Sequence, residues 1–188
     1  MLNEIIHFVH KLRKVKYLVR YSNNPLVTQK DTVASHSWRA ATLALLLRKD
    51  LEKRDINAQK VVDLLLIHDL VEINNEEVTA LGNRDRKAKA FIEEETAKIL
   101  LSEYSGSWVE GTQQLLDEFI AQQTIEAKIA KALDNYESNM HVIEEKEPLR
   151  DDNHRQLTID YIKRREGILD TIDELIGVQL DEIRRVEK

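Results

Sequence analysis

Apolar residues recur every three or four positions along most of this chain, and this spacing constrains the fold more strongly than any other feature of the sequence. Near the N-terminus the pattern runs through Leu2, Ile5, Phe8, Val9, Leu12 and Val15. It is the spacing of one face of an α-helix. Only five glycines and two prolines occur among the 188 residues, too few for the turns of a many-stranded sheet. The sequence therefore predicts an all-α fold.

The helical segments predict a bundle of about six to eight helices in a single domain over residues 1–188. A chain of this length buries a core large enough for one folded unit, and no repeat or low-complexity tract divides it. Thr32 or Ser35 is expected to cap a second helix, and Asn57 a third. A long final helix is expected over residues 153–186.

The charge balance and the lack of cysteine exclude several classes of function. The chain has 28 Lys and Arg against 34 Asp and Glu, a formal net charge of -6, which argues against a nucleic-acid backbone as the main partner. Without cysteine there is no disulfide, no thiolate nucleophile and no Cys-ligated zinc. No signal pattern is visible, and no apolar run reaches the roughly 18 residues that span a bilayer. We therefore expect a cytoplasmic protein whose partners include neither nucleic-acid polymers nor membranes.

His68 and Asp69 stand together at the end of a strongly apolar helical segment, and Glu72 follows one turn later. Residues three and four positions apart lie on neighbouring faces of a helix. A neutral imidazole and a carboxylate at adjacent positions are able to reach one cation. These residues therefore predict part of a metal site.

Two further ligands are expected from distant segments, His36 near the start of the second helix and Asp134 within a helix that begins at Thr124. Asp134 stands among apolar neighbours, where a carboxylate is costly to bury unless it is paired or bound to metal. Two imidazoles and two carboxylates suit Mn, Co, Zn, Fe or Ni better than Ca or Mg, because imidazole favours the borderline transition metals. The sequence predicts a divalent metal cofactor without fixing its identity.

Each of these residues also has a simpler interpretation. A single His on a helix is usually solvated or hydrogen-bonded, and Asp134 could pair with Lys131. His68 could interact favourably with the dipole of the helix that it ends. The spacing alone leaves both interpretations open.

The ordered set of these residues resembles the HD-domain phosphohydrolases, in particular the small 5'-deoxynucleotidase branch that includes the bacterial YfbR proteins. The segment around His36, TVASHSW, is similar to the V-x-E-H-S segment of that branch, and IHDLVE is similar to its H-D-x-x-E. The similarity covers residues 5–145. The resemblance implies a single-domain helical bundle of the HD type.

In that family two His and two Asp hold one divalent cation, and the Glu of H-D-x-x-E assists catalysis. The resemblance therefore implies that His36, His68, Asp69 and Asp134 are metal ligands. It also implies that Glu72 positions or deprotonates the water that attacks phosphorus.

The resemblance further implies contacts with the substrate. In the family an Arg at the end of the first helix, here expected over residues 3–19, precedes an aromatic residue, and Arg20 and Tyr21 match this pair. Glu77 stands at the position of the Asp in the family's T-G-D loop, which reaches toward the nucleotide. Two departures are notable. The loop reads N-E-E in place of T-G-D. Ser35 stands where the family usually has a Glu before the first His, and this replacement removes a side chain that would orient the imidazole.

The function expected from the residues and the resemblance is hydrolysis of nucleoside 5'-monophosphates, with deoxyribonucleotides preferred, to nucleoside and phosphate. One alternative is the same machinery acting on another phosphate ester or on a nucleotide polyphosphate. A second is a nucleotide-binding module that has lost turnover. The final long helix is compatible with a homodimer and equally with closing the core of a monomer, and the sequence leaves this open.

Overall fold

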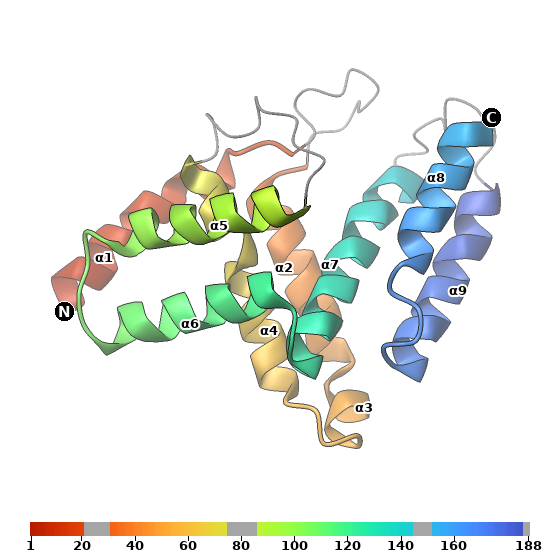
Figure 1. Ribbon diagram of the computed structural model, residues 1–188, viewed down its shortest axis with the longest axis horizontal. Helices are drawn as coiled ribbons and strands as arrows, with labels where there is room; N and C mark the ends of the chain where they lie inside the picture. Colours follow the sequence, from red (N-terminus) through yellow and green to blue (C-terminus); the bar gives the residue numbers. More distant parts are fainter. Residues whose placement is uncertain (21–30, 75–85, 145–151, 186–188) are drawn as a thin grey trace.

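The computed structural model describes residues 1–20, 31–74, 86–144 and 152–185, and within these ranges the chain forms helices joined by short connections, with one isolated β-bridge. Figure 1 shows the arrangement of the helices. The all-α prediction is confirmed. The elements are α1 (Leu2–Lys11), the 3₁₀ helix η1 (Leu12–Lys16), α2 (Val33–Leu46), α3 (Arg48–Glu52), α4 (Ala58–Ile67), the 3₁₀ helix η2 (His68–Asn74), α5 (Arg86–Leu101), α6 (Ser107–Ala121), α7 (Ile125–Glu144), α8 (Asp152–Lys163) and α9 (Asp170–Arg185).

Helices α2, α4 and α7 pack against one another at the centre of the molecule (Figure 1). On one side α5 and α6 form a hairpin, and η1 contacts η2. On the other side α8 and α9 pack as a pair, and α9 lies along α7. The group of three central helices therefore has packing partners on both sides, with α7 in contact with α8 and α9. Helices α2 and α7 carry predicted ligands, and α4 leads into the others.

The interior contains two clusters of buried apolar side chains that meet near His68. The first cluster surrounds α2, α4 and α7 and includes the fully buried Leu64 and Leu65. The second lies among α1, the two 3₁₀ helices, α5 and α6, and includes Leu70 and Val71. The chain thus leaves one cluster and enters the other within a few residues. The polar residues of the predicted site lie where the two apolar clusters meet.

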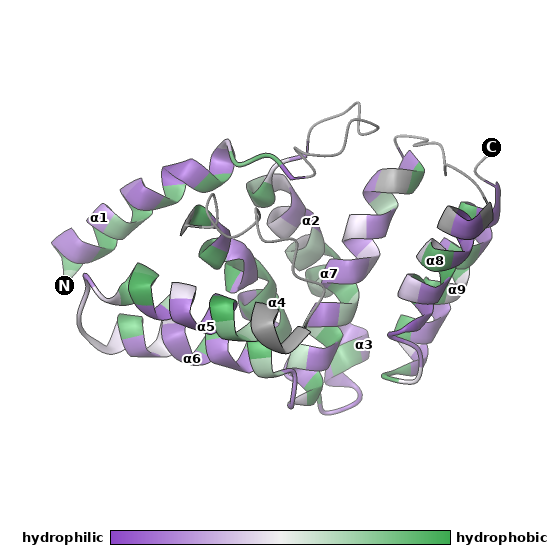
Figure 2. Cartoon of the chain, turned by 45° about the horizontal axis from the view of Figure 1, so that its top comes forward, coloured by the Kyte–Doolittle hydropathy of each residue, from purple (hydrophilic) through white to green (hydrophobic). Residues whose placement is uncertain are grey.

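Every helix also carries hydrophilic residues, which Figure 2 shows in purple beside the green hydrophobic segments. This amphipathic pattern fits helices that bury one face and expose the other. Within the described ranges, no helix combines the length and the apolar character that crossing a membrane requires.

Side-chain caps fix the starts of the two helices that bring in the histidines. The Thr32 hydroxyl accepts a hydrogen bond from the Ser35 backbone N–H at 3.2 Å, and the Ser35 hydroxyl accepts one from the Thr32 backbone N–H at 2.9 Å. The Asn57 side chain accepts from the Lys60 backbone N–H at 3.0 Å. Such reciprocal and single caps satisfy backbone donors that a helix start otherwise leaves unpaired. Both expected caps are confirmed, with Thr32 as the cap and Ser35 as its partner.

An antiparallel bridge between Val19 and Thr32 brings the segment after η1 to the start of α2. Beside it, the Arg20 backbone N–H donates to the Asp31 carbonyl at 2.9 Å. Arg20 is therefore held next to the helix that carries His36.

The prediction of one long helix over residues 153–186 is wrong, because the structure has two helices there, α8 and α9. Between them Gly167 has a φ of +81°, a left-handed conformation that glycine adopts without steric cost. Its backbone N–H donates to the Asp173 carboxylate at 2.8 Å, which stabilises the turn. The first helix is also shorter than the expected 3–19, since α1 gives way to η1 at Leu12.

The contrast between two neighbouring leucines of α4 tests this packing. Leu64 is fully buried, whereas the side chain of Leu66 is 52% exposed. We expect Leu64→Ala to lower the free energy of unfolding by about 2–5 kcal/mol, because it leaves a cavity in the core. Leu66→Ala is the matched control and should change it by less than about 0.5 kcal/mol. Urea unfolding measures both, and equal losses would contradict the assignment of the buried face.

Candidate metal centre

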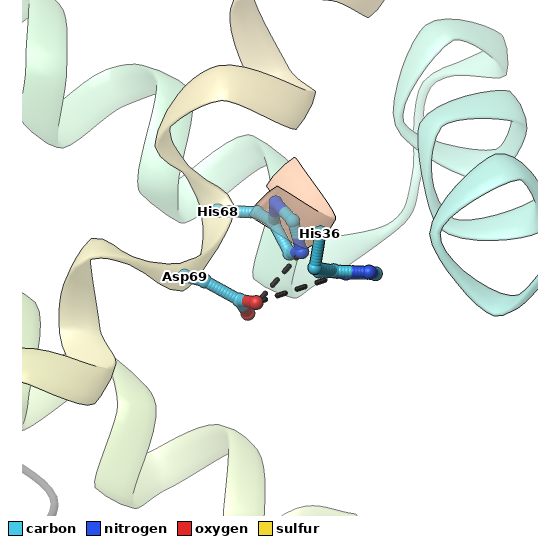
Figure 3. A group of neighbouring side chains, drawn as sticks. All are labelled: His36, His68 and Asp69. Atoms are coloured by element: carbon cyan, nitrogen blue, oxygen red, sulfur yellow. Dashed lines mark ion pairs between the residues drawn. The ribbon is translucent and has the colours of Figure 1, made fainter. Parts of the chain in front are cut away.

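The two predicted histidine ligands are buried and come from different helices. His36 lies in the first turns of α2 and has no exposed surface, and His68 follows the last residue of α4 and is 5% exposed. Their ring centroids are 5.4 Å apart in an edge-on arrangement. Figure 3 shows both rings beside the Asp69 carboxylate. The packing of α2 against α4 therefore brings together side chains that are 32 positions apart in the sequence.

The Nδ1 atom of His68 is fixed by the end of its own helix. It donates a hydrogen bond to the Leu65 backbone carbonyl at 2.8 Å. A carbonyl only accepts, so Nδ1 carries the hydrogen and the neutral ring presents a lone pair at Nε2. Nε2 is buried, and its polar neighbours are the carboxylates of Asp69 and Asp134. A buried nitrogen of this kind is a suitable ligand for a cation.

Two aspartates face the Nε2 atoms of both rings. The Asp69 carboxylate lies 3.2 Å from Nε2 of His68 and 3.8 Å from Nε2 of His36 (Figure 3). Oδ1 of Asp134, from α7, lies 2.9 Å from Nε2 of His36 and 3.6 Å from Nε2 of His68. The structure therefore brings all four predicted ligands to one point, from α2, the junction of α4 with η2, and α7.

The second oxygen of Asp134 has a different partner. Its Oδ2 accepts a hydrogen bond from the Lys131 ammonium at 2.6 Å, and Lys131 lies over the ring of Phe119 at 5.2 Å from its centroid. The pairing with Lys131 that the sequence left open is thus present, but it occupies only one oxygen. The other oxygen stays directed at the histidines.

The electrostatics of this cluster favour positive charge between the aspartates. Burial alone would lower the pKa of His68, but the nearby Asp69 and Asp134 carboxylates raise it to about 10. Burial would raise the pKa of Asp69, but His68 lowers it to about 2. The pKa of Asp134 is also held well below its usual range against burial, first by Lys131 and then by the two histidines. The carboxylates therefore favour positive charge at Nε2 of His68, carried by a proton or by a metal ion that replaces it.

The donor set fits a divalent transition metal. One ligand atom each from His36, His68 and Asp69 lies within 4.8 Å of the others, and Asp134 adds a carboxylate oxygen beside both imidazoles. Imidazole with carboxylate suits Mn, Fe, Co, Ni or Zn. The side chain of Asp69 is 21% exposed, so the cluster is in contact with solvent on that side.

The remaining predicted site residues are placed only in part. Glu72 is half-buried in η2, where three residues make a turn, so it lies on the same face as Asp69. Arg20 is paired within the protein. Its guanidinium lies 3.5 Å from the Glu137 carboxylate and donates to the Ser138 hydroxyl at 2.9 Å. Tyr21 and the N-E-E loop with Glu77 lie outside the described residues.

Glu137 is a site residue that reasoning from the sequence missed. Its carboxylate contacts Nδ1 of His36, and its side chain is only 4% exposed. The available signal was its position three residues after Asp134, which places both acids on neighbouring faces of one helix. Ser35, in contrast, uses its hydroxyl in the cap of α2.

Comparisons with known proteins agree with this geometry. A model of the HD domain family matches residues 11–175. The 5'-deoxynucleotidase HDDC2 of Bos taurus is 29% identical over 111 residues, 59% of this chain and 52% of that protein. The protein of the same name from Homo sapiens is 27% identical over 111 residues, which again cover 59% of this chain and 52% of that protein. The chain therefore spans about half the length of the curated relatives it matches.

A solved structure shows the same fold. It is the crystal structure of a predicted metal-dependent phosphohydrolase from Magnetospirillum magnetotacticum MS-1, with a TM-score of 0.78 at 23% identity. The match covers 98% of this chain and 93% of the other.

We expect the purified protein to bind a divalent transition metal, and His68→Ala and Asp134→Ala each to lose it, because either change removes a donor from the cluster. His10→Ala is the matched control, since His10 is exposed on α1. Elemental analysis after equilibration with Mn²⁺ or Zn²⁺ and removal of excess metal measures the content. Unchanged metal in both site variants would show that the ion binds elsewhere.

Proposed function

The chain belongs to the HD domain family, and we propose that it is a metal-dependent phosphohydrolase that converts nucleoside 5'-monophosphates, deoxyribonucleotides in particular, to nucleoside and phosphate. The convergence of two imidazole Nε2 atoms and two aspartates at one partly exposed point carries this proposal. The relatives named as 5'-deoxynucleotidases support the class of substrate.

In the proposed site His36, His68, Asp69 and Asp134 hold one divalent cation. Such an ion polarises a phosphoryl oxygen and lowers the pKa of bound water, which supplies a nucleophile at neutral pH. The protein side chains fix the ligand atoms before substrate arrives. His68 does so through the Leu65 carbonyl. Asp134 does so through Lys131, whose ammonium holds the oxygen that faces away from the histidines.

Glu72 and Arg20 act on the water and the phosphate in this proposal. Glu72 lies on the same face of η2 as Asp69, so its carboxylate is suited to take the proton of the attacking water. Water then adds to phosphorus, the bond from phosphorus to the 5'-oxygen breaks, and the proton taken up by Glu72 passes to that oxygen, directly or through water, so that nucleoside and phosphate leave. Arg20, which pairs with Glu137, stabilises the charge on the phosphoryl oxygens in this proposal. Tyr21 and Glu77 contact the rest of the nucleotide.

A panel of phosphate-release assays tests this function. Deoxyribonucleoside and ribonucleoside monophosphates, nucleoside triphosphates and simple phosphate esters are each assayed with Mn²⁺, Co²⁺, Ni²⁺ and Mg²⁺, with detection of both phosphate and pyrophosphate. We expect phosphate from the monophosphates and the highest rates with the transition metals. Turnover of triphosphates or of other esters alone would assign another substrate. Tight nucleotide binding without phosphate release would indicate a binding module.

The sequence left a homodimer open, and the expected cytoplasmic location stays a prediction. Ile172, Ile176 and Leu180 of α9 are buried in the first apolar cluster. The apolar stripe of the C-terminal segment thus closes the core of the chain itself, and it gives no separate argument for a dimer. Light scattering of the purified protein measures the oligomeric state directly.

Replacement of Glu72 by Gln tests its role in activating water. Gln keeps the shape of the side chain and removes the basic carboxylate, so the fold and the bound metal should be unchanged. We expect kcat to fall by about 10²- to 10⁴-fold, the usual contribution of a positioned acid or base. Glu52→Gln, at an exposed position of α3, is the control. A near-normal rate in Glu72→Gln would assign activation of the water to the metal alone.

The divergent N-E-E loop is expected to alter the choice of sugar. Glu77 has one methylene more than the Asp of T-G-D, and Glu76 restricts the backbone where the family has glycine. We therefore expect this protein to discriminate between dAMP and AMP less strongly than it would with a T-G-D loop. The triple change Asn75→Thr, Glu76→Gly and Glu77→Asp should raise the ratio of kcat/KM for dAMP over AMP. If that ratio is unchanged while activity is intact, selectivity lies elsewhere.

A further inference from the structure

A buried carboxylate contacts the edge of His36 that faces away from the predicted cation. Glu137 lies one turn after Asp134 on α7, and its side chain is 4% exposed. Asp134 approaches Nε2 of His36 at 2.9 Å, whereas Glu137 contacts Nδ1 of the same ring. Two acids of one helix therefore contact the two nitrogen atoms of one imidazole from a second helix.

This contact favours a hydrogen on Nδ1 of His36. A carboxylate only accepts hydrogen bonds, so Nδ1 donates to Glu137, and without a metal Nε2 donates to Asp134 in the same way. A cation bound between Nε2 and Asp134 would replace the Nε2 hydrogen, and the contact with Glu137 would keep the remaining hydrogen on Nδ1. The opposite tautomer would place a hydrogen at Nε2 and block coordination. A carboxylate that accepts from the far nitrogen also raises the basicity of a ligating imidazole.

The protein stabilises the buried charge of Glu137 with two guanidinium groups. Arg39 lies 3.3 Å from Oε1 of Glu137, and Arg20 lies 3.5 Å from Oε2. A buried carboxylate is costly without such partners. Arg20 is also the residue that the proposed function places on the phosphate. Glu137 therefore links the proposed metal ligand His36 to the proposed phosphate contact Arg20.

We propose that Glu137 is a positioning residue, which holds His36 in the tautomer that ligates through Nε2 and holds the Arg20 guanidinium beside that imidazole. The proposal rests on the proposed function, since it presupposes a metal at this cluster. Ser35, which directly precedes His36, serves in the cap of α2, and the carboxylate that contacts Nδ1 of the imidazole comes from α7.

Glu137→Gln is the variant that tests this role, because it keeps the size of the side chain. Either orientation of the amide disfavours the native arrangement. With nitrogen toward His36, the ring is driven to the wrong tautomer, and with oxygen toward His36, an NH₂ group faces a guanidinium. The fold should persist, because Arg39 keeps Glu144 at 2.8 Å and Arg20 keeps Asp31 at 3.5 Å.

The matched control is Glu144→Gln. This change also removes one negative charge from α7 and one partner of Arg39. The side chain of Glu144, however, is 43% exposed. Zn²⁺ affinity is measured by competition with a chelator in the wild type and both variants, with circular dichroism to check folding. We expect Glu137→Gln to bind Zn²⁺ about 10- to 100-fold more weakly, the usual effect of removing such a partner. Glu144→Gln should bind as the wild type does.

The tautomer itself is read by NMR on ¹⁵N-histidine-labelled protein loaded with Zn²⁺. In the wild type we expect His36 to show a protonated Nδ1 and a metal-bound Nε2, and we expect the Nδ1 proton signal to be lost or shifted upfield in Glu137→Gln. A purely structural role for Glu137 would not move this signal. The measurement requires no turnover, and the wild-type spectrum alone is informative if the variant does not fold.

The outcomes separate the two proposals. If the wild type shows no Zn²⁺ on His36, the metal site and the proposed function fail together. If Zn²⁺ binds through Nε2 in the wild type but Glu137→Gln keeps the affinity and the Nδ1 signal, the role of Glu137 is overturned and the metal site stands. Coordination of His36 through Nδ1 in the wild type would also overturn the role of Glu137.

Discussion

Helix α7 carries two carboxylates, Asp134 and Glu137, into the interior of the protein, and much of the structure around them compensates their charge. An unpaired buried carboxylate is strongly destabilising. Asp134 is paired with Lys131 and with the imidazole of His36, while Glu137 has His36 and two arginines. Apart from Lys131, which lies on α7 itself, these partners come from α2 and from the segment that precedes it. The arrangement of charge therefore depends on how α2 crosses α7, and the same crossing is fixed by the apolar contacts of the first cluster.

The local features of the site could be predicted from the sequence, whereas its long-range contacts could not. His68 and Asp69 are adjacent, and an acid such as Asp134 in an apolar helical segment is visible as an anomaly. The contact of His36 with Glu137 joins residues that are 101 positions apart in the sequence. The spacing of apolar residues predicts each helix but not how two helices cross, so this contact could not be predicted. The 3₁₀ geometry of η2 was also missed, because residues three apart and residues four apart are both close on an α-helix.

The break at Gly167 shows a different limit of sequence analysis. The apolar stripe of the last segment continues past the glycine, so that periodicity favours an unbroken helix. The chain instead turns back, and α8 and α9 both place apolar residues in the first cluster, Ile162 from one and Ile176 from the other. A folded pair buries both stripes against one core, whereas a single straight helix would extend one of them into solvent.

The bridge between Val19 and Thr32 anchors both ends of the segment that separates Arg20 from α2. Since the two ends are held by hydrogen bonds, the length of chain between them is not what places Arg20 or His36. The entropy of closing a loop grows slowly, by about 0.6 kcal/mol for each doubling of its length. The hydrogen bonds at these two anchors therefore set the position of Arg20 relative to the start of α2, and an insertion between the anchors would cost little free energy as long as both anchors are kept.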